Sequence, residues 1–104
     1  MSDVVECVQF KLKDGVSDAD FVTASEVVNV WIKSRPGFRY RSLSKDAAGE
    51  WRDIVYWESR ETAHQASELF MQDLCHSDFM QMIDEASVLM NHSDVKLNLA
   101  GACG

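Results

Sequence analysis

The sequence is poor in basic residues, and this scarcity excludes two classes of partner. Ten Lys and Arg residues stand against seventeen Asp and Glu residues, which gives a formal net charge of −7. Such a chain lacks the basic surface that nucleic acids and anionic membranes require. It also lacks an apolar run long enough to cross a bilayer. We therefore expect neither a nucleic-acid partner nor a membrane partner.

Cysteine is also scarce, and the ligand patterns of metal and nucleotide sites are missing. Cys7, Cys75 and Cys103 form an odd, widely spaced set, which indicates neither a disulfide framework nor a zinc ribbon. The N-terminal residues are acidic and include no cationic segment. Together these features favour reduced thiols in the cytoplasm. No His-x-x-x-His pair, Cys-x-x-Cys pair or Gly-rich phosphate loop occurs, so we expect no metal and no cofactor.

The apolar residues that are present alternate in four segments and recur at helical spacing in three others. Alternation predicts strands over residues 4–12, 38–45, 51–58 and part of 88–99. Helical spacing predicts helices over residues 17–34 and 60–73, each opened by a serine cap, and a short helix from residue 77.

The order of these elements is β-α-β-β-α-β within one domain spanning residues 1–104. This order is typical of the ferredoxin-like fold, an α+β fold in which two helices cover one face of a four-stranded antiparallel sheet. Within residues 88–99, the alternation of Val95, Leu97 and Leu99 is the clearest strand signal. We expect residues 100–104 to form a frayed tail.

The segment 51–59 has apolar residues on both faces of its predicted strand. Trp51, Val55 and Trp57 point to one side, whereas Ile54 and Tyr56 point to the other. Helices on one face of the sheet would leave the second set as an exposed apolar patch, which is rare on a soluble monomer. We therefore expect a twofold homodimer in which two sheets pack face to face.

A set of short motifs resembles one known family. These motifs are Pro36-Gly37-Phe38, residues 51–59, Glu61-Thr62-Ala63, Ala66, Ser77-Asp78-Phe79 and Ile83-Asp84. They resemble the dimeric α+β barrel superfamily, and most of all its antibiotic biosynthesis monooxygenase-like branch. The resemblance spans residues 4–99 and implies a homodimeric barrel with a pocket between each sheet and its own helices.

The resemblance also implies an activity. It implies a cofactor-independent monooxygenase, or a related proton-transfer enzyme, that acts on a small aromatic or polyketide-like molecule. The alternative is a barrel that binds a small ligand, or serves in stress, without catalysis. Haem-degrading members use an asparagine on the first strand and a tryptophan and a histidine in the second helical region. The corresponding positions here hold Val8, Gln65 or Ala66, and Asp84, none of which matches.

Two residues are candidates for the catalytic base. Glu6 shares a strand face with Val8 and Phe10, where desolvation would disfavour its charged form. The alternative is a strand-end glutamate that reaches solvent or pairs with a cation. His92 lies just before the clearest part of the last strand and would shuttle a proton if it faced the pocket. The alternative is a loop histidine. We expect His64 and His76 to be solvated.

Aromatic residues are candidates for the lining of a substrate pocket, or alternatively for plain core. The candidates for substrate binding are Trp57, Tyr40, Tyr56, Trp31 and Phe10. Arg39 and Arg41 are expected to share one face of the second strand with Leu43. These arginines are candidates for holding an anionic substrate, but a solvated or interfacial role is favoured.

Overall fold

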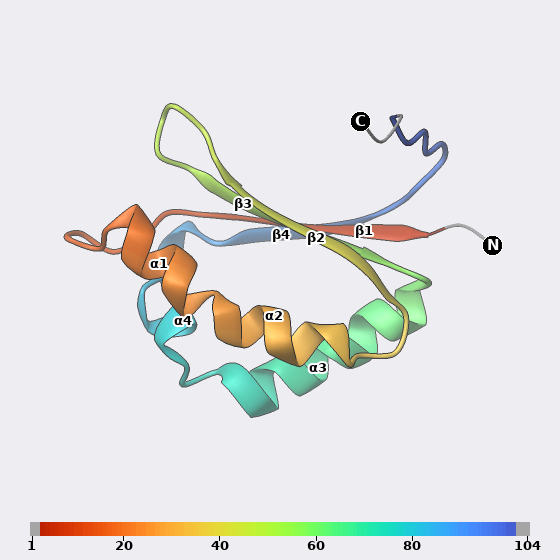
Figure 1. The fold of residues 1–104 in the computed structure, drawn as a ribbon, viewed down its shortest axis with the longest axis horizontal. Coiled ribbons are helices and arrows are strands. Elements are labelled where there is room, and N and C mark those ends of the chain that lie inside the picture. Colours follow the sequence, from red (N-terminus) through yellow and green to blue (C-terminus); the bar gives the residue numbers. More distant parts are fainter. Residues whose placement is uncertain (1–2, 102–104) are drawn as a thin grey trace.

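A computed structural model describes residues 3–101 as a four-stranded antiparallel sheet with helices on one face (Figure 1). The strands are β1 (Val4–Phe10), β2 (Phe38–Lys45), β3 (Trp51–Trp57) and β4 (Leu89–Asp94). The helices are α1 (Asp18–Ala24), α2 (Glu26–Lys33), α3 (Arg60–Leu74) and α4 (Asp78–Gln81), followed by the short 3₁₀ helix η1 (Glu85–Ser87). The strand order β2-β3-β1-β4 confirms the predicted ferredoxin-like α+β fold.

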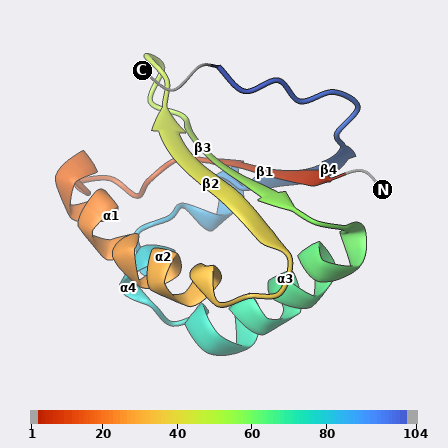
Figure 2. The same ribbon diagram turned by 45° about the vertical axis from the view of Figure 1, so that its right-hand side comes forward.

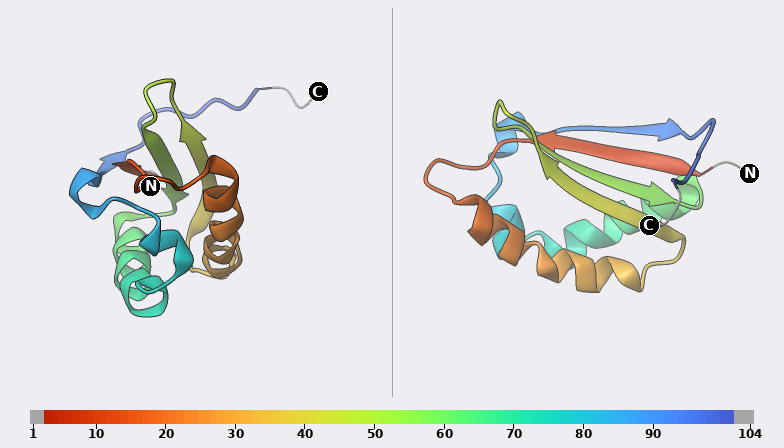
Figure 3. Two further views of the ribbon diagram at one scale, coloured as in Figure 1. Left: turned by 90° about the vertical axis from the view of Figure 1, so that its left-hand side faces the viewer. Right: turned by 45° about the horizontal axis from the view of Figure 1, so that its top comes forward.

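The helices all lie on the same side of the sheet, and the opposite face is open (Figures 1 and 3). The segment after β4 runs on the open side, away from the helices (Figure 2). Within residues 3–101, none of the helices combines the length and the apolar character needed to cross a bilayer.

The helix predicted over residues 17–34 is divided into α1 and α2 at Ser25. Its start is as predicted, because the Ser17 side chain accepts a hydrogen bond from the backbone N–H of Asp20 at 3.1 Å. Ser25 is buried, and its hydroxyl accepts a hydrogen bond from Arg41 on β2 at 3.0 Å. The break between α1 and α2 thus occurs at the residue through which this helical segment is hydrogen-bonded to the sheet.

The last strand lies within the predicted region 88–99 but ends at Asp94, so the expectation that Val95–Leu99 is its clearer half is wrong. β1 is the neighbour of β4, and its first residue, Val4, already pairs with Asp94. The backbone N–H of Val95 still donates a hydrogen bond to the Asp3 carbonyl at 2.8 Å, and within residues 3–101 the pairing with β1 goes no further. Leu97 and Leu99 are 87% and 94% exposed. The predicted tail is exposed at residues 100 and 101, and its residues 102–104 lie outside the described chain.

The face assignment of β3 is confirmed. Trp51, Val55 and Trp57 are buried beneath the helices, and Ile54 and Tyr56 lie on the open face. The buried residues belong to two clusters. One contains Phe10, Phe21, Val28, Trp51, Leu74, Phe79 and Ile83, and the other contains Ile32, Val55, Trp57, Ala63 and Ala66.

The hairpin between β2 and β3 is organised by Asp46. Its side chain accepts hydrogen bonds from the backbone N–H groups of Ala48 and Glu50, both at 3.0 Å. The bond from Glu50 is the main reason that the pKa of Asp46 lies below its ordinary value, and Arg52 lowers it further. The hairpin turns at Gly49, whose φ of 89° suits glycine.

Gly37 precedes β2 and is a position where an added side chain would disturb the fold. Its φ is 80°, and a Cβ there would lie 2.6 Å from the Thr62 hydroxyl oxygen. That hydroxyl belongs to the cap of α3, since it accepts a hydrogen bond from the backbone N–H of Ser59 at 3.2 Å.

We expect Gly37→Ala to lower the free energy of unfolding by more than about 1 kcal/mol, because the residue would be strained and would also displace the cap. Gly49→Ala is the matched control, since Gly49 has a similar φ of 89° but open space around its Cβ position. Urea denaturation of the two variants would measure the difference. Equal losses in both variants would show that the contact with Thr62 has no effect.

Candidate active site

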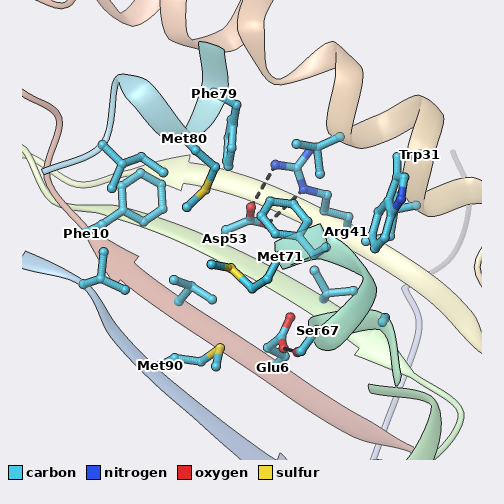
Figure 4. Close-up of a pocket in the computed structure, with 18 of the residues that line it drawn as sticks. Glu6, Phe10, Trp31, Arg41, Asp53, Ser67, Met71, Phe79, Met80 and Met90 are labelled. Carbon is cyan, nitrogen blue, oxygen red and sulfur yellow. Dashed lines mark hydrogen bonds and ion pairs between the residues drawn. The ribbon is translucent and has the colours of Figure 1, made fainter. Parts of the chain in front are cut away.

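A pocket lies between the sheet and its helices, where the two core clusters meet. Its volume is about 270 Å³, the liquid volume of about nine water molecules. Its lining is formed by Glu6, Val8, Phe10, Val28, Trp31, Ile32, Arg41, Asp53, Val55, Trp57, Ala66, Ser67, Phe70, Met71, Phe79, Met80, Ile83, Glu85, Val88 and Met90. Figure 4 shows two polar groups within this mainly apolar lining: Glu6 beside Ser67, and Arg41 beside Asp53.

Three of the five predicted substrate-binding aromatics line this pocket, namely Trp57, Trp31 and Phe10. Their roles in binding stay a prediction. Tyr40 and Tyr56 lie instead on the open face of the sheet, with ring centroids 6.2 Å apart. The hypothesis that both tyrosines share one pocket with the tryptophans is therefore wrong. A register shift after Phe38 turns Tyr40 away from the helices.

Glu6 projects from β1 into the pocket wall, and its side chain is 13% exposed. Ser67 on α3 donates a hydrogen bond to its Oε2 at 3.2 Å. His92 Nε2 lies 2.9 Å from the same oxygen, and the imidazole donates because an ionised carboxylate only accepts. Within residues 3–101, no hydrogen bond involves Oε1. One carboxylate oxygen is thus fixed by two donors, and the other remains available to a ligand.

The second candidate base, His92, lies on β4 and pairs directly with Glu6 across the β1–β4 ladder. Its ring stacks on that of His64 with centroids 5.5 Å apart and planes 16° apart. His92 contacts Glu6 from the neighbouring strand and is not among the pocket-lining residues. His64, expected to be solvated, is exposed but contacts His92 through this stack. His76 is exposed, as expected.

The favoured surface or interfacial role of Arg41 is wrong. Its side chain is 5% exposed, and its guanidinium forms two hydrogen bonds with Asp53, from Nε at 3.0 Å and from an Nη at 2.8 Å. The other Nη donates to Ser25 at 3.0 Å and to Asn29 at 2.7 Å. Arg39 agrees with the expectation, because its side chain is 53% exposed and reaches Asp3 only at 3.7 Å.

Sequence reasoning missed several residues of the site, although signals for them exist. Ser67 follows Ala63 by one helical turn and Ala66 by one residue, so the buried stripe of α3 runs beside it. Asp53 lies between Trp51 and Val55 and alternates with apolar partners, as Glu6 does on β1. For both Glu6 and Asp53, the signal of a site residue was therefore a charged side chain on the apolar face of a strand.

Three methionines also escaped sequence reasoning. Met71 and Met90 are 56% and 55% exposed and line the pocket from α3 and β4, and Met80 joins them from α4. Methionine is flexible enough to fit ligands of different shape. In the sequence, the spacing of these methionines does not distinguish pocket-lining residues from core residues.

A ferredoxin-like sheet with a helix-covered apolar pocket and a carboxylate in the pocket wall defines a class of α+β proteins able to hold a small molecule. No protein-family model and no curated protein matches the sequence. Solved structures do match. They confirm, at the level of the fold, the resemblance to antibiotic biosynthesis monooxygenase-like proteins.

Three of these structures illustrate the likeness. SnoaB from Streptomyces nogalater, a cofactor-independent oxygenase, has a TM-score of 0.66 and 15% identity over 96% of this chain and 97% of its own. The haem-degrader MhuD from Mycobacterium tuberculosis, with two haems bound, has a TM-score of 0.73 and 14% identity over 93% and 99%. A dimeric ferredoxin-like protein from an uncultured marine organism has a TM-score of 0.72 and 9% identity over 98% and 95%.

The positions that correspond to the haem-degrading branch have other uses here. Val8 and Ala66 contribute aliphatic surface to the pocket. Asp84 caps η1, because its side chain accepts a hydrogen bond from the backbone N–H of Ala86 at 3.2 Å. No histidine of the described chain lines the pocket. The likeness to MhuD therefore concerns the fold.

Proposed function

We propose that this protein is a cofactor-independent monooxygenase, or a related proton-transfer enzyme, that acts on a small aromatic or polyketide-like molecule. The observation that carries the proposal is the Glu6 carboxylate, which faces an aromatic-walled pocket while Ser67 and His92 hold its Oε2. The fold shared with SnoaB, a cofactor-independent oxygenase, supports the same reaction class.

In the proposed mechanism, Glu6 removes the proton. A phenolic or similarly acidic ligand donates its proton to Oε1, which leaves the electron pair on the ligand. The anion passes one electron to O₂, and the ligand radical and superoxide combine into a peroxide. The peroxide forms at a ring carbon that carries a hydrogen, and it takes back the proton held by Glu6. Loss of the hydrogen on that carbon, with cleavage of the O–O bond, releases water and leaves a carbonyl on the ligand. The lining around the anion is mainly apolar, so the anion would be poorly solvated, which favours loss of an electron to O₂.

His92 is a positioning residue in this mechanism. Its hydrogen bond at 2.9 Å fixes the carboxylate, and its stack on the exposed His64 lies between Glu6 and solvent.

We expect Glu6→Gln to lower the rate of oxygen uptake by about 10²- to 10⁴-fold, because glutamine cannot act as a base. An oxygen electrode would measure uptake with a panel of anthrones and hydroquinones, corrected for their spontaneous oxidation. Glu68→Gln is the matched control, since Glu68 is exposed on α3 and does not line the pocket. His92→Ala should slow uptake less than Glu6→Gln does and should change its pH profile.

Two results would contradict the proposal. Oxygen uptake that is the same in the wild type and in Glu6→Gln would remove Glu6 as the base. No uptake across the panel, together with a small molecule found bound by native mass spectrometry, would favour the alternative of a ligand-binding barrel without catalysis.

We also propose that the protein functions as a homodimer whose open sheet faces pack together. The exposed Tyr40, at 60%, and Leu89, at 65%, lie on this face with Ile54 and Tyr56. A structure of the same fold is a dimeric ferredoxin-like protein. A cytoplasmic location stays a prediction, supported by the free thiols of Cys7 and Cys75.

A further inference from the structure

The donors and acceptors of the pocket lining are unequally available to a ligand. Four hydrogen bonds from Arg41 go to Asp53, Ser25 and Asn29, which occupies four of the five N–H groups of its guanidinium. Asp53 also neutralises its charge at 2.8 Å. The only cationic side chain that lines the pocket in the described chain is thus already paired.

The other side-chain donors of the lining are also withdrawn from a ligand. The Trp31 indole N–H donates to Asp73 at 2.8 Å, and the Ser67 hydroxyl donates to Glu6. The Trp57 indole nitrogen is enclosed by protein, without a partner in the described chain.

One acceptor, by contrast, remains free. Glu6 Oε1 has no hydrogen bond within residues 3–101. Three acidic residues, Glu6, Asp53 and Glu85, contribute to the lining, against one basic residue, Arg41. A buried anionic ligand would find repulsion without a compensating donor, and burial of an unpaired charge is costly. A ligand hydroxyl or ammonium would instead meet a free carboxylate oxygen.

We propose that this pocket selects a flat apolar ligand whose polar end is an uncharged or cationic hydrogen-bond donor, and that it excludes carboxylate-bearing analogues. The selection resides in Glu6, which presents Oε1 to the ligand, and in Asp53, which cancels the charge of Arg41. The cavity of about 270 Å³ accommodates two or three fused rings within its apolar part. This inference rests on the proposed role of the pocket as the ligand site, but it does not depend on oxygen chemistry.

The test is calorimetric titration with two probes of the same shape, 2-naphthol and 2-naphthoate, at neutral pH and without oxygen. We expect 2-naphthol to bind wild-type protein at least about tenfold more tightly than 2-naphthoate, because only the carboxylate must be buried unpaired. Glu6→Gln should reduce this preference, since the amide removes the facing charge and can donate a hydrogen bond. Glu68→Gln, which changes net charge equally but lies outside the pocket, should retain the preference.

Equal or tighter binding of 2-naphthoate to the wild type would overturn the inference, as would binding of neither probe. A preference that persists in Glu6→Gln would remove Glu6 as its source. The two proposals fail separately. A clear preference for 2-naphthol without oxygen uptake on any anthrone would reject the oxygenase alone. Glu6-dependent uptake with no discrimination between the probes would reject the selectivity alone.

Discussion

Arg41→Met is expected to lower the free energy of unfolding by about 3–5 kcal/mol, because it leaves a buried carboxylate without its partner. The Asp53 side chain is 13% exposed, and both of its oxygens accept hydrogen bonds from Arg41 at 3.0 and 2.8 Å. Methionine retains the aliphatic part of the side chain, so the loss reports the charge and hydrogen bonds rather than a cavity. Urea denaturation at one fixed protein concentration would measure it.

Two further variants make this result specific. Arg39→Met changes the neighbouring arginine, which is 53% exposed, and it should alter stability by less than about 1 kcal/mol, since exposed ion pairs contribute little. The double variant Arg41→Met with Asp53→Leu should recover most of the loss, because removal of both members leaves no unpaired charge. A double variant no more stable than Arg41→Met would mean that the loss comes from packing.

The contrast between the two arginines also shows where sequence reasoning was insufficient. Alternation placed Arg39 and Arg41 on one face of β2, and this held for Arg41 with Leu43 beneath the helices. The register shift between Phe38 and Tyr40 has no residue signature such as a glycine, so neither it nor the position of Tyr40 could be predicted. The prediction failed at a bulge, where the two-residue period is interrupted.

The strands and helices themselves were predictable because local signals agreed. Ser17, Ser59 and Ser77 cap the helices that follow them, and β2 has the predicted bounds Phe38–Lys45. The end of β4 was not predictable, because it depends on where β1 begins. The alternation at Leu97 and Leu99 is typical of a strand, but a strand forms only where a neighbouring strand is present to share its backbone hydrogen bonds.

The active site was predictable only in part for a related reason. Glu6 and His92 were each singled out, but from separate patterns 86 residues apart in sequence. Their pairing follows from the β1–β4 register, which a single sequence does not specify. The hydrogen bond from Ser67 then requires that α3 pass over the same point of the sheet.

Ile54→Glu is expected to convert the proposed dimer into a monomer while leaving the fold intact. Ile54 lies opposite Cys7 on the open face, in the strand between β2 and β1. In a sheet-to-sheet dimer, the new carboxylate of each copy would be buried in the interface without a compensating charge, and such mismatched charges cost several kcal/mol. The apparent dissociation constant should therefore rise by about 10²-fold or more.

Light scattering coupled to size exclusion would separate the monomer, of mass 11.8 kDa, from a dimer of twice that mass. Val30→Glu is the matched control, because it makes the same change at a 72% exposed position on α2, away from the sheet. Circular dichroism should be unchanged in both variants.

Within residues 3–101, the apolar residues after β4 do not cover this face, since Leu97 and Leu99 remain 87% and 94% exposed. A wild-type mass of 11.8 kDa at all concentrations would therefore reject the dimer. A dimer that survives Ile54→Glu would reject this face as its interface.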